Sequence, residues 1–462
     1  MSPCKPCLTN TFLTPPEPTL RINTSHRKIA TPLPVPASSA RLAAAARLFP
    51  QVNCYQPPII WERASGYQVF DSVGNVWIDF TSTAVTTNTG HGHDSIRQAL
   101  AEHIDTGLLA QFNFASEIRI ELAEKLVELA PDHCDQVYFW TVGSETIEAA
   151  LRVARLWGMH QHPEKWHVLT HVGDFHGWTL GAHQLSGSGS QKNWLASPDR
   201  GIHHLPFPRE SPTEGVDWKS WLDRNLGELA DRGVRGEDVA AVVIETLQGW
   251  GALPLPVAYI KRLREWADAH QVLLVFDEIQ TGFGRTGKMF GHEHYGVKAD
   301  LICVGKGVTS SLPLAAVLGP KEVFEVLAPA EITTTHAGHP LSCAAALANL
   351  AVLEKENLVA AADRKGALVR QELHRLQQRF PRHVSEVCGL GLLNAIHVCD
   401  PQTGEPSREL ARDWTWSGVR HGVMLFQVNQ PTIKVCPPLT TPDDALVEGV
   451  QALGQALTAI LD

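Results

Sequence analysis

Beyond about residue 116, segments with the apolar spacing of helices alternate with short, nearly continuous apolar runs. Apolar residues recur every three or four positions in EIRIELAEKLVELA, SETIEAALRVARLW and AYIKRLREWADAH, which predicts helices. The continuous runs are typical of buried strands and read QVYFW, WHVLTH, VAAVVIET, VLLVFDE and DLICVG. Strands separated by helices predict an α/β fold with a parallel sheet covered on both faces. Ligands of such sheets bind beyond the carboxyl ends of the strands.

The segments on either side of this region have different patterns. Residues 1–45 are rich in Pro, Thr and Ser and predict a flexible N-terminal arm. From Ile59 to Phe80, apolar and polar residues alternate around a Gly-Asn turn, which predicts an antiparallel β-element. The stretch after residue 356 predicts a long helix, short strands in GLGLLNAIHV and IKVCPPL, and a last helix. We therefore expect a large domain at 111–355 and a smaller α+β domain formed by 46–110 and 356–462.

Composition narrows the class of protein. The 462 residues are 44% hydrophobic, which is enough for two domains with their own cores. The formal net charge of −10 and the lack of basic runs argue against nucleic acid or anionic lipid as partners. No stretch approaches the roughly 20 apolar residues of a membrane span, and the N-terminus lacks the apolar core of a signal peptide. We expect a cytoplasmic protein.

The cysteines and histidines do not predict a disulfide framework or a metal site. Nine cysteines are an odd number spread thinly along the chain, so we expect buried thiols. Cys4 and Cys7 form a C-x-x-C motif, but no second pair follows at the spacing of a zinc site. The 22 histidines show no cluster with ligand spacing either.

A first candidate for chemistry lies in FWTVGSETIEAALRVAR, where a predicted strand passes into a helix at Gly143-Ser144. Backbone N–H groups at a helix start form an anion pocket that suits a phosphate. Gly-Ser followed by Glu145 is also an ordinary helix cap. The pattern alone leaves both interpretations open.

Two further strand ends carry carboxylates. VLLVFDEIQTGFGRTGKMFG is apolar up to Asp277-Glu278, and a carboxylate there is desolvated and needs a cation or a proton opposite it. A structural ion pair would satisfy this need equally well. Glu245 occupies a similar position in VVIETLQGWG, and Trp250 follows it in the loop.

Lys306 lies between two apolar runs in DLICVGKGVTSSLPLAAVLG. An unpaired buried ammonium group is costly, so this lysine either reaches solvent or uses its nitrogen chemically. A phosphate cup, a buried acid and an isolated amine at one sheet edge are the groups that pyridoxal phosphate (PLP) requires. Its aldehyde needs a lysine for the Schiff base, its ring nitrogen a carboxylate, and its phosphate a cup. The combination favours the chemical role of Lys306.

At these motifs the chain resembles the class III, or omega, aminotransferases, a family of fold-type I PLP enzymes. The likeness covers roughly residues 50–462, with VFDEIQTGFGRTGKMFG and VGKG...LPLAAVLG as its specific motifs. It implies a mainly parallel seven-stranded sheet between helices. It also implies that Lys306 and Asp277 are catalytic, with Asp277 at the pyridine nitrogen, Gln280 at the ring hydroxyl and Ile279 under the ring.

Other segments extend the resemblance. GDFHGWT is similar to the family's aromatic-His-Gly stretch, which makes Phe175 the ring that stacks on the cofactor, with His176 beside it. Plain core packing is the alternative for Phe175. TTTHAGHPL resembles the segment whose threonine, here Thr335, reaches the phosphate of the neighbouring subunit. The resemblance thus implies a homodimer with shared active sites, in which Gly143 and Ser144 belong to the phosphate cup.

The chain departs from the family pattern where a substrate carboxylate is recognised. Members that bind an α-carboxylate hold an arginine in I-R-F-x-P-P-L, paired at rest with a glutamate that corresponds to Glu245. This chain reads IKVCPPL, and its Lys434 lacks the bidentate fork of arginine. The usual EPVQGEG reads ETLQGWG, which places Trp250 at the pocket mouth. We therefore expect an amine or amino-sugar donor rather than a simple α-amino acid, with a carbonyl compound as acceptor.

Alternatives to an aminotransferase stay open at this point. The layout also resembles 2,2-dialkylglycine decarboxylase, in PIIWERASG and DFTS. That enzyme type has a carboxylate-binding glutamine soon after DFTS, where this chain has Thr83, Ala84 and Val85. Racemases of the family keep similar core motifs. A non-catalytic binding module on the same fold is the alternative from another class, and the intact Asp277 and Lys306 argue against it.

Overall fold

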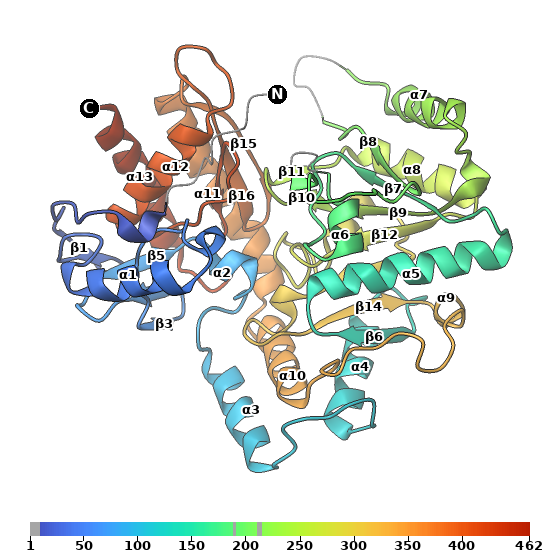
Figure 1. The fold of residues 1–462 in the computed structure, drawn as a ribbon. Coiled ribbons are helices and arrows are strands. Elements are labelled where there is room, and N and C mark those ends of the chain that lie inside the picture. Colours follow the sequence, from blue (N-terminus) through green and yellow to red (C-terminus); the bar gives the residue numbers. More distant parts are fainter. Residues whose placement is uncertain (1–9, 188–190, 210–214) are drawn as a thin grey trace. The chain divides into compact units, whose positions relative to one another are not determined.

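The computed structural model describes residues 10–187, 191–209 and 215–462, which belong to two units (Figure 1). Unit 1 comprises Met1–His93 and Arg364–Asp462, and unit 2 comprises Asp94–Asp363. Cys4 and Cys7 lie outside the described residues. The seven cysteines within them are all buried and form no disulfide with one another. No helix in the described part of the chain has both the length and the apolar character of a membrane span.

A seven-stranded sheet forms the centre of unit 2, in the order β6-β14-β13-β12-β9-β7-β8. Neighbours from β13 to β8 are parallel, whereas β14 is antiparallel to both β13 and β6. This confirms the expected α/β fold with a mainly parallel seven-stranded sheet. The strands are β6 (Gln136–Trp140), β7 (His167–His171), β8 (Ile202–Leu205), β9 (Val239–Glu245), β12 (Leu273–Asp277), β13 (Leu301–Val304) and β14 (Ala315–Gly319).

Helices pack against this sheet, and α5 (Gly143–Gln161) contacts β6, β7, β9, β12, β13 and β14. Its buried residues, such as Ile147 and Val153, share one core cluster with Val243, Val275 and Cys303 of the strands. Each fully buried aliphatic side chain contributes about 1.5–3 kcal/mol, so this face anchors the start of α5 to the sheet. The other helices of unit 2 are α3 (Asp94–Asp105), α4 (Glu117–Leu129), α6 (Leu180–Leu185), α7 (Trp218–Asp231), α8 (Val257–Ala269), α9 (Lys321–Phe324) and α10 (Pro340–Lys355). Short elements complete it: β10 (Leu247–Gln248), β11 (Leu253–Pro254), and the 3-10 turns η5 (Gly236–Asp238), η6 (Gly291–Tyr295) and η7 (Lys306–Val308).

Unit 1 contains two sheets. One has the order β1-β2-β5-β4-β3, with β17 parallel to β5, and its antiparallel β3-β4-β5 confirms the β-element expected between Ile59 and Phe80. The other has the order β15-β16-β18 and is antiparallel throughout. The elements are β1 (Ile22–Asn23), β2 (Lys28–Ile29), α1 (Ser39–Leu48), β3 (Arg63–Ser65), β4 (Gln68–Phe70), β5 (Val76–Asp79), α2 (Ser82–Val85), α11 (Leu358–Arg379), β15 (Val384–Leu390), β16 (Leu393–Val398), α12 (Arg408–Arg420), β17 (Val423–Met424), β18 (Thr432–Val435) and α13 (Asp443–Leu461), with 3-10 turns η1 (Thr11–Leu13), η2 (Pro36–Ser38) and η3 (Gln51–Asn53).

The N-terminal segment differs from the flexible arm expected for residues 1–45. From residue 10 onward it folds into unit 1, where β2 pairs with β5. Buried Arg27 donates to Glu448 Oε1 at 2.8 Å, and Glu17 binds Trp416 Nε1 at 2.7 Å. The partners come from α12 and α13, far along the chain, so the local composition of the segment could not reveal them.

The boundaries of the units also differ from those expected. The first lies between His93 and Asp94 rather than near residue 110, because α3 packs against α10 of unit 2. The second lies within α11, between Asp363 and Arg364, rather than before that helix.

Candidate active site

Three parallel strands of unit 2 end in register at one edge of its sheet. Asp277, the last residue of β12, lies opposite Glu245 of β9 on one side and Cys303 of β13 on the other. All residues of these strands are buried. Lys306 follows Cys303 by three residues. The fold therefore brings the expected acid, the expected glutamate and the expected lysine to the same edge.

Both oxygens of the Asp277 carboxylate have partners. Oδ2 lies 2.8 Å from Nδ1 of His176, and Oδ1 accepts a hydrogen bond from the Ile279 N–H at 3.1 Å. Asp277 and His176 are only 6% and 2% exposed, so the pair is shielded from water. Burial and the Asp277 charge raise the pKa of the Cys303 thiol well above its ordinary value, which keeps this neighbour protonated. Asp277 is thus a buried acid with an imidazole as one hydrogen-bond partner.

The adjacent Glu278 shows the structural role that was the alternative for this motif. It is fully buried and accepts hydrogen bonds from the N–H groups of Gly291 at 2.8 Å and His292 at 2.6 Å. Burial alone would raise the pKa of Glu278, but the hydrogen bond and the charge of His292 outweigh it and lower that pKa. Glu278 therefore anchors the loop after β12, whereas Asp277 is turned toward His176.

Lys306 lies in a strained turn at the end of β13. Its φ is +40°, a left-handed conformation that costs a non-glycine residue about 1–2 kcal/mol, and its side chain is half-buried. Strain of this kind persists where the surroundings hold a residue in place, and it is concentrated at functional sites. A Cβ on the preceding Gly305 would lie 3.3 Å from Cγ2 of Ile279. Lys306 thus leaves the sheet beside Ile279.

The start of α5 adjoins the same isoleucine. A Cβ on Gly143 would lie 2.9 Å from Cδ1 of Ile279. The residue before the helix is Val142, which has no side-chain acceptor, so the interpretation of this segment as a side-chain N-cap does not hold. The first N–H groups of α5 consequently keep their capacity for an anion.

Ser144 links this helix start to the GDFHGWT segment. Its Oγ accepts a hydrogen bond from the Trp178 N–H at 3.2 Å. A Cβ on Gly177 would lie 2.1 Å from the same oxygen, and Gly177 has a φ of +134°. A side chain at Gly177 would therefore fill the space beside Ser144.

Glu245 is held by main-chain groups and lies beside Phe175, the ring expected to stack on the cofactor, and near Trp250, expected at the pocket mouth. Its Oε1 accepts from the Phe175 N–H at 2.8 Å, and its Oε2 accepts from the Gly249 N–H at 3.0 Å. The ring of Phe175 contacts that of Trp250 edge to face, with centroids 5.1 Å apart. A Cβ on Gly249 would lie 3.0 Å from Oε1 of Gln280. These contacts bring together four side chains, those of Glu245, Phe175, Trp250 and Gln280.

Two further expected residues, Thr335 and Lys434, belong to segments outside the central sheet of unit 2. Thr335 is exposed and lines a hollow of about 350 Å³ together with residues 108, 110–112 and 114–116. Lys434 belongs to unit 1, where it is 3% exposed on β18 and lies opposite Ala395 of β16. The roles expected for Thr335 and Lys434 stay predictions.

Sequence reasoning missed a layer of residues behind His176. Nε2 of His176 lies 3.2 Å from Thr170 Oγ1, and the backbone N–H of His176 donates to Ser186 Oγ at 2.9 Å. Asp174 accepts from the Glu245 N–H at 3.3 Å and lies 3.4 Å from Nδ1 of His171. Asp174 directly precedes Phe175-His176 in the chain. An acid at this position was the signal in the sequence that could have revealed this layer.

The arrangement fits the groups that PLP requires. A half-buried lysine, a buried carboxylate with a histidine partner, and a helix start without a side-chain cap lie in one unit. Ile279 contacts both the lysine turn and the helix start, and the glycine at 177 leaves room beside Ser144. The residues present can therefore hold the aldehyde, the ring nitrogen and the phosphate of this cofactor.

Comparison with known proteins bears on the same question. Residues 51–457 match the aminotransferase class-III family. Acetylornithine aminotransferase of Corynebacterium efficiens is 32% identical over 423 residues, which cover 89% of this chain and 96% of that protein. Isoleucine 2-epimerase of Lentilactobacillus buchneri is 31% identical over 421 residues, covering 89% and 92%. The PLP-bound structure of an amine transaminase from an uncultivated Pseudomonas species has a TM-score of 0.79 at 29% identity, covering 87% of this chain and 94% of that one. The chain belongs to the class-III aminotransferases, a family of PLP-dependent enzymes.

Proposed function

We propose that this protein is an aminotransferase that moves an amino group from an amine or amino acid donor to a carbonyl acceptor. The observation that carries the proposal is the register of β9, β12 and β13, which sets the His176-paired Asp277 beside the strand that leads to Lys306. An enzyme that moves a proton on the carbon beside an amino nitrogen needs two groups within reach of the substrate, a buried acid and a basic amine.

Each residue has a role in this proposal. When bound, PLP supplies an electron sink for the carbon that carries the amino group. Asp277 keeps a proton on the ring nitrogen, because a buried carboxylate that faces a cation stays charged. Lys306 would hold the cofactor through Nζ until the amino group of the donor takes the place of that nitrogen. The released Nζ would then accept a proton from the donor carbon and return it to the cofactor carbon that Nζ had held.

The remaining residues bind and orient. The N–H groups of Gly143 and Ser144 bind the phosphate at the start of α5. Phe175 and Ile279 contact the ring and exclude water from it, and Gln280 donates to the ring hydroxyl. His176 holds Asp277 in place through the 2.8 Å contact.

The substrate class follows from Glu245 and its surroundings. Its carboxylate is held by two N–H groups beside the rings of Phe175 and Trp250, which suits a cationic amine with an apolar or sugar-like body. Lys434 takes the place of an arginine fork and binds a carboxylate only as a point charge. We therefore propose an amine or amino-sugar donor in preference to a simple α-amino acid.

Racemisation is a second candidate, because a protein 31% identical to this chain is an isoleucine 2-epimerase. Racemisation needs the same Asp277 and Lys306, but it returns the proton to the carbon from which it was removed. The dialkylglycine type of decarboxylation uses the same groups and releases carbon dioxide.

One experiment separates these reactions. The purified holoenzyme is mixed, without an acceptor, with L-glutamate, with an amine that lacks a carboxylate, or with an amino sugar, while its visible absorbance is followed. Transamination converts the cofactor to its amine form and yields one carbonyl product per site, without inversion of the donor and without carbon dioxide. Inversion of an amino acid with an unchanged final spectrum would overturn the proposal in favour of racemisation. Lys306→Ala should abolish every one of these changes, whereas Lys321→Ala, at an exposed lysine of α9, should leave them intact.

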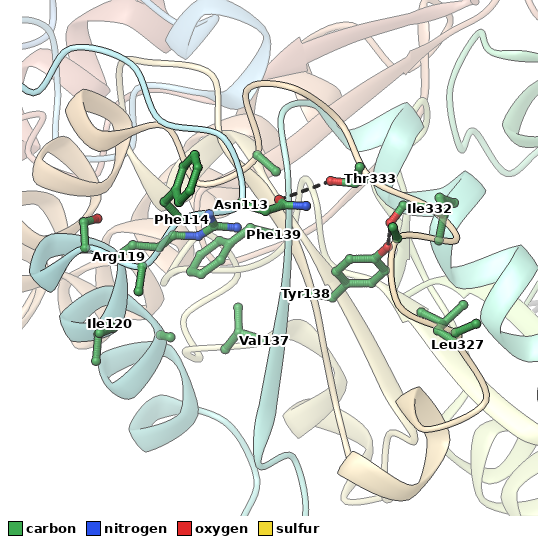
Figure 2. A pocket seen from close by; sticks show the side chains of 16 residues that line it. Asn113, Phe114, Arg119, Ile120, Val137, Tyr138, Phe139, Leu327, Ile332 and Thr333 are labelled. Carbon is green, nitrogen blue, oxygen red and sulfur yellow. Dashed lines mark hydrogen bonds between the residues drawn. The ribbon is translucent and has the colours of Figure 1, made fainter.

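We also propose that two copies of the chain share their active sites. The hollow that Thr335 lines shares residues 114–116 with a second hollow of about 560 Å³, which is lined by residues of α4 and β6 and by residues between 327 and 333 (Figure 2). Asn113 and Thr333 are joined across this hollow by a hydrogen bond of 3.3 Å. Apolar side chains are exposed around the two hollows: Phe112 is 47%, Phe114 75% and Ile120 45% exposed. Apolar groups gathered in this way are typical of an interface.

Mixed dimers test the shared site. Lys306→Ala and Thr335→Asp chains should each be inactive alone, the second because its charge repels a phosphate. If the site is shared, co-expression of the two chains should restore about a quarter of the sites, since one site of each mixed dimer carries neither change. Mixed dimers without activity, or an active Thr335→Asp protein, would contradict the shared site. Neither result would affect the aminotransferase proposal, which the wild-type spectrum tests.

A further inference from the structure

Glu386, Cys388 and His397 form a cluster of side chains in unit 1 that can bind a metal ion. One ligand atom from each lies within 4.8 Å of the other two. Glu386 and His397 are half-buried and Cys388 is 9% exposed, so the cluster is sheltered but reachable from solvent. Glu386 and Cys388 belong to β15, and His397 belongs to β16.

A β-bulge produces this cluster. Val384 lies opposite Val398, but two residues later Glu386 lies opposite His397, because the register shifts between Val384 and Glu386. Regular pairing would set Glu386 opposite Ile396 and turn it to the other face of the sheet from His397. Bulges that re-aim a side chain in this way are common beside functional sites. The shift puts Glu386, Cys388 and His397 on one face.

We propose that Glu386, Cys388 and His397 bind a zinc ion. A thiolate, an imidazole and a carboxylate are the ligand types that Zn²⁺ accepts together, and three protein ligands with a water molecule complete its tetrahedral geometry. Zinc ligands at about 2.0–2.3 Å lie roughly 3.3–3.8 Å from one another. The present separations, at most 4.8 Å, exceed this range by no more than about 1.5 Å, which side-chain rotations can remove.

The charges on this sheet face agree with a divalent ion. Lys434 of β18 lies opposite Ala395, and Ala395 lies opposite Cys388, so the lysine belongs to the same face. The carboxylate and the thiolate together balance the two charges of Zn²⁺. The occupied site is therefore neutral, and Lys434 does not repel it.

The position of the cluster indicates what the ion does. β15 is the outer strand of the three-stranded sheet, and the bulge interrupts its ladder at Glu386. An ion held by ligands from β15 and β16 joins the two strands where their pairing is irregular. Zinc stabilises the folded chain because it binds that state in preference to the unfolded one.

The test measures zinc binding by the full-length holoenzyme after treatment with a chelator. Calorimetric titration with Zn²⁺ should give one site per chain, and the melting temperature should rise by several degrees. Cys388→Ser, His397→Ala and Glu386→Gln should each weaken binding by at least about 10-fold, since loss of a group that only supports a metal ligand already costs about 10- to 100-fold. The visible spectrum of the cofactor reports whether each variant is folded, and Glu386→Gln keeps the size of the side chain.

Two control variants make the test specific. The double variant Cys4→Ser/Cys7→Ser removes the C-x-x-C motif and should bind zinc like the wild type. His374→Ala removes an exposed histidine of α11 and should also have no effect. The proposal is overturned if the wild type binds no zinc, if Cys388→Ser binds it as tightly as the wild type, or if only the Cys4/Cys7 variant loses it.

Discussion

Nδ1 of His176 lies 2.8 Å from Oδ2 of Asp277, although 101 positions separate the two residues in the chain. Both are almost fully buried, and Asp277 ends a strand whose neighbours carry Glu245 and lead to Lys306. A charged acid is stable in such surroundings only while its partner is present. The orientation of Asp277 therefore depends on a loop that is distant in sequence.

His176→Asn should lower kcat by roughly 10- to 100-fold, because a hydrogen bond to a charged group contributes about 1.5–3 kcal/mol. The affinity for PLP should fall as well, since Asp277 loses its orientation. Steady-state rates and cofactor titration measure the two effects. His183→Asn changes another buried histidine of unit 2 and should leave both values nearly unchanged. Equal losses in the two variants would show that His176 acts through general stability.

Gly177→Ala should weaken cofactor binding and lower the melting temperature. The added Cβ would lie 2.1 Å from Ser144 Oγ, in a φ region that L-residues rarely adopt. We expect a loss of about 1–3 kcal/mol, measured by denaturant titration of the holoenzyme. Gly227→Ala is the matched control, because nothing lies within 4 Å of its Cβ in α7. That change should stabilise the helix by about 0.5–1 kcal/mol, opposite in sign.

Lys434→Arg should raise kcat/KM for α-amino acid donors by at least about tenfold and leave carboxylate-free amines unaffected. An arginine fork binds a carboxylate through two hydrogen bonds, and 1.4 kcal/mol corresponds to a factor of ten. Rates with both donor types measure the selectivity. Lys365→Arg, at another buried lysine of unit 1, should change neither. An equal change with both donors would contradict a role for Lys434 in carboxylate recognition.

Stability should fall as the solution is acidified from pH 6.5 toward 4. Burial and the neighbouring His167 lower the pKa of His203 from 6.5 to about 4. The unfolded chain therefore binds more protons than the folded chain in this range. The stability that a neutral His203 contributes is complete above pH 6.5 and is lost as the pH falls through about 4. His203→Gln should flatten the dependence of the melting temperature on pH between these values. The exposed His160→Gln should not, and a curve unchanged in His203→Gln would count against this assignment.

Much of the fold and several site residues could be predicted from local pattern. The runs that became β6, β7, β9, β12 and β13 are short and apolar because these strands are covered on both faces. Asp277, Glu245 and Lys306 stand out because each follows such a run directly. By contrast, β8 was missed because it reads IHHL, and its two histidines interrupt the apolar pattern at a sheet edge. β14 was visible as an apolar run, but its antiparallel direction was not.

Hydrophobic periodicity is a property of neighbouring residues, so the sequence by itself determined where strands and helices form and which polar groups end them. Partnerships between distant segments were decided only by the tertiary structure. The sheet order β6-β14-β13-β12-β9-β7-β8 is not the chain order, and it alone aligns Asp277 with Glu245. In the same way, one bulge sets Glu386 opposite His397, and docking against α12 and α13 orders the N-terminal segment. These contacts depend on register and packing across the chain, which no local pattern encodes.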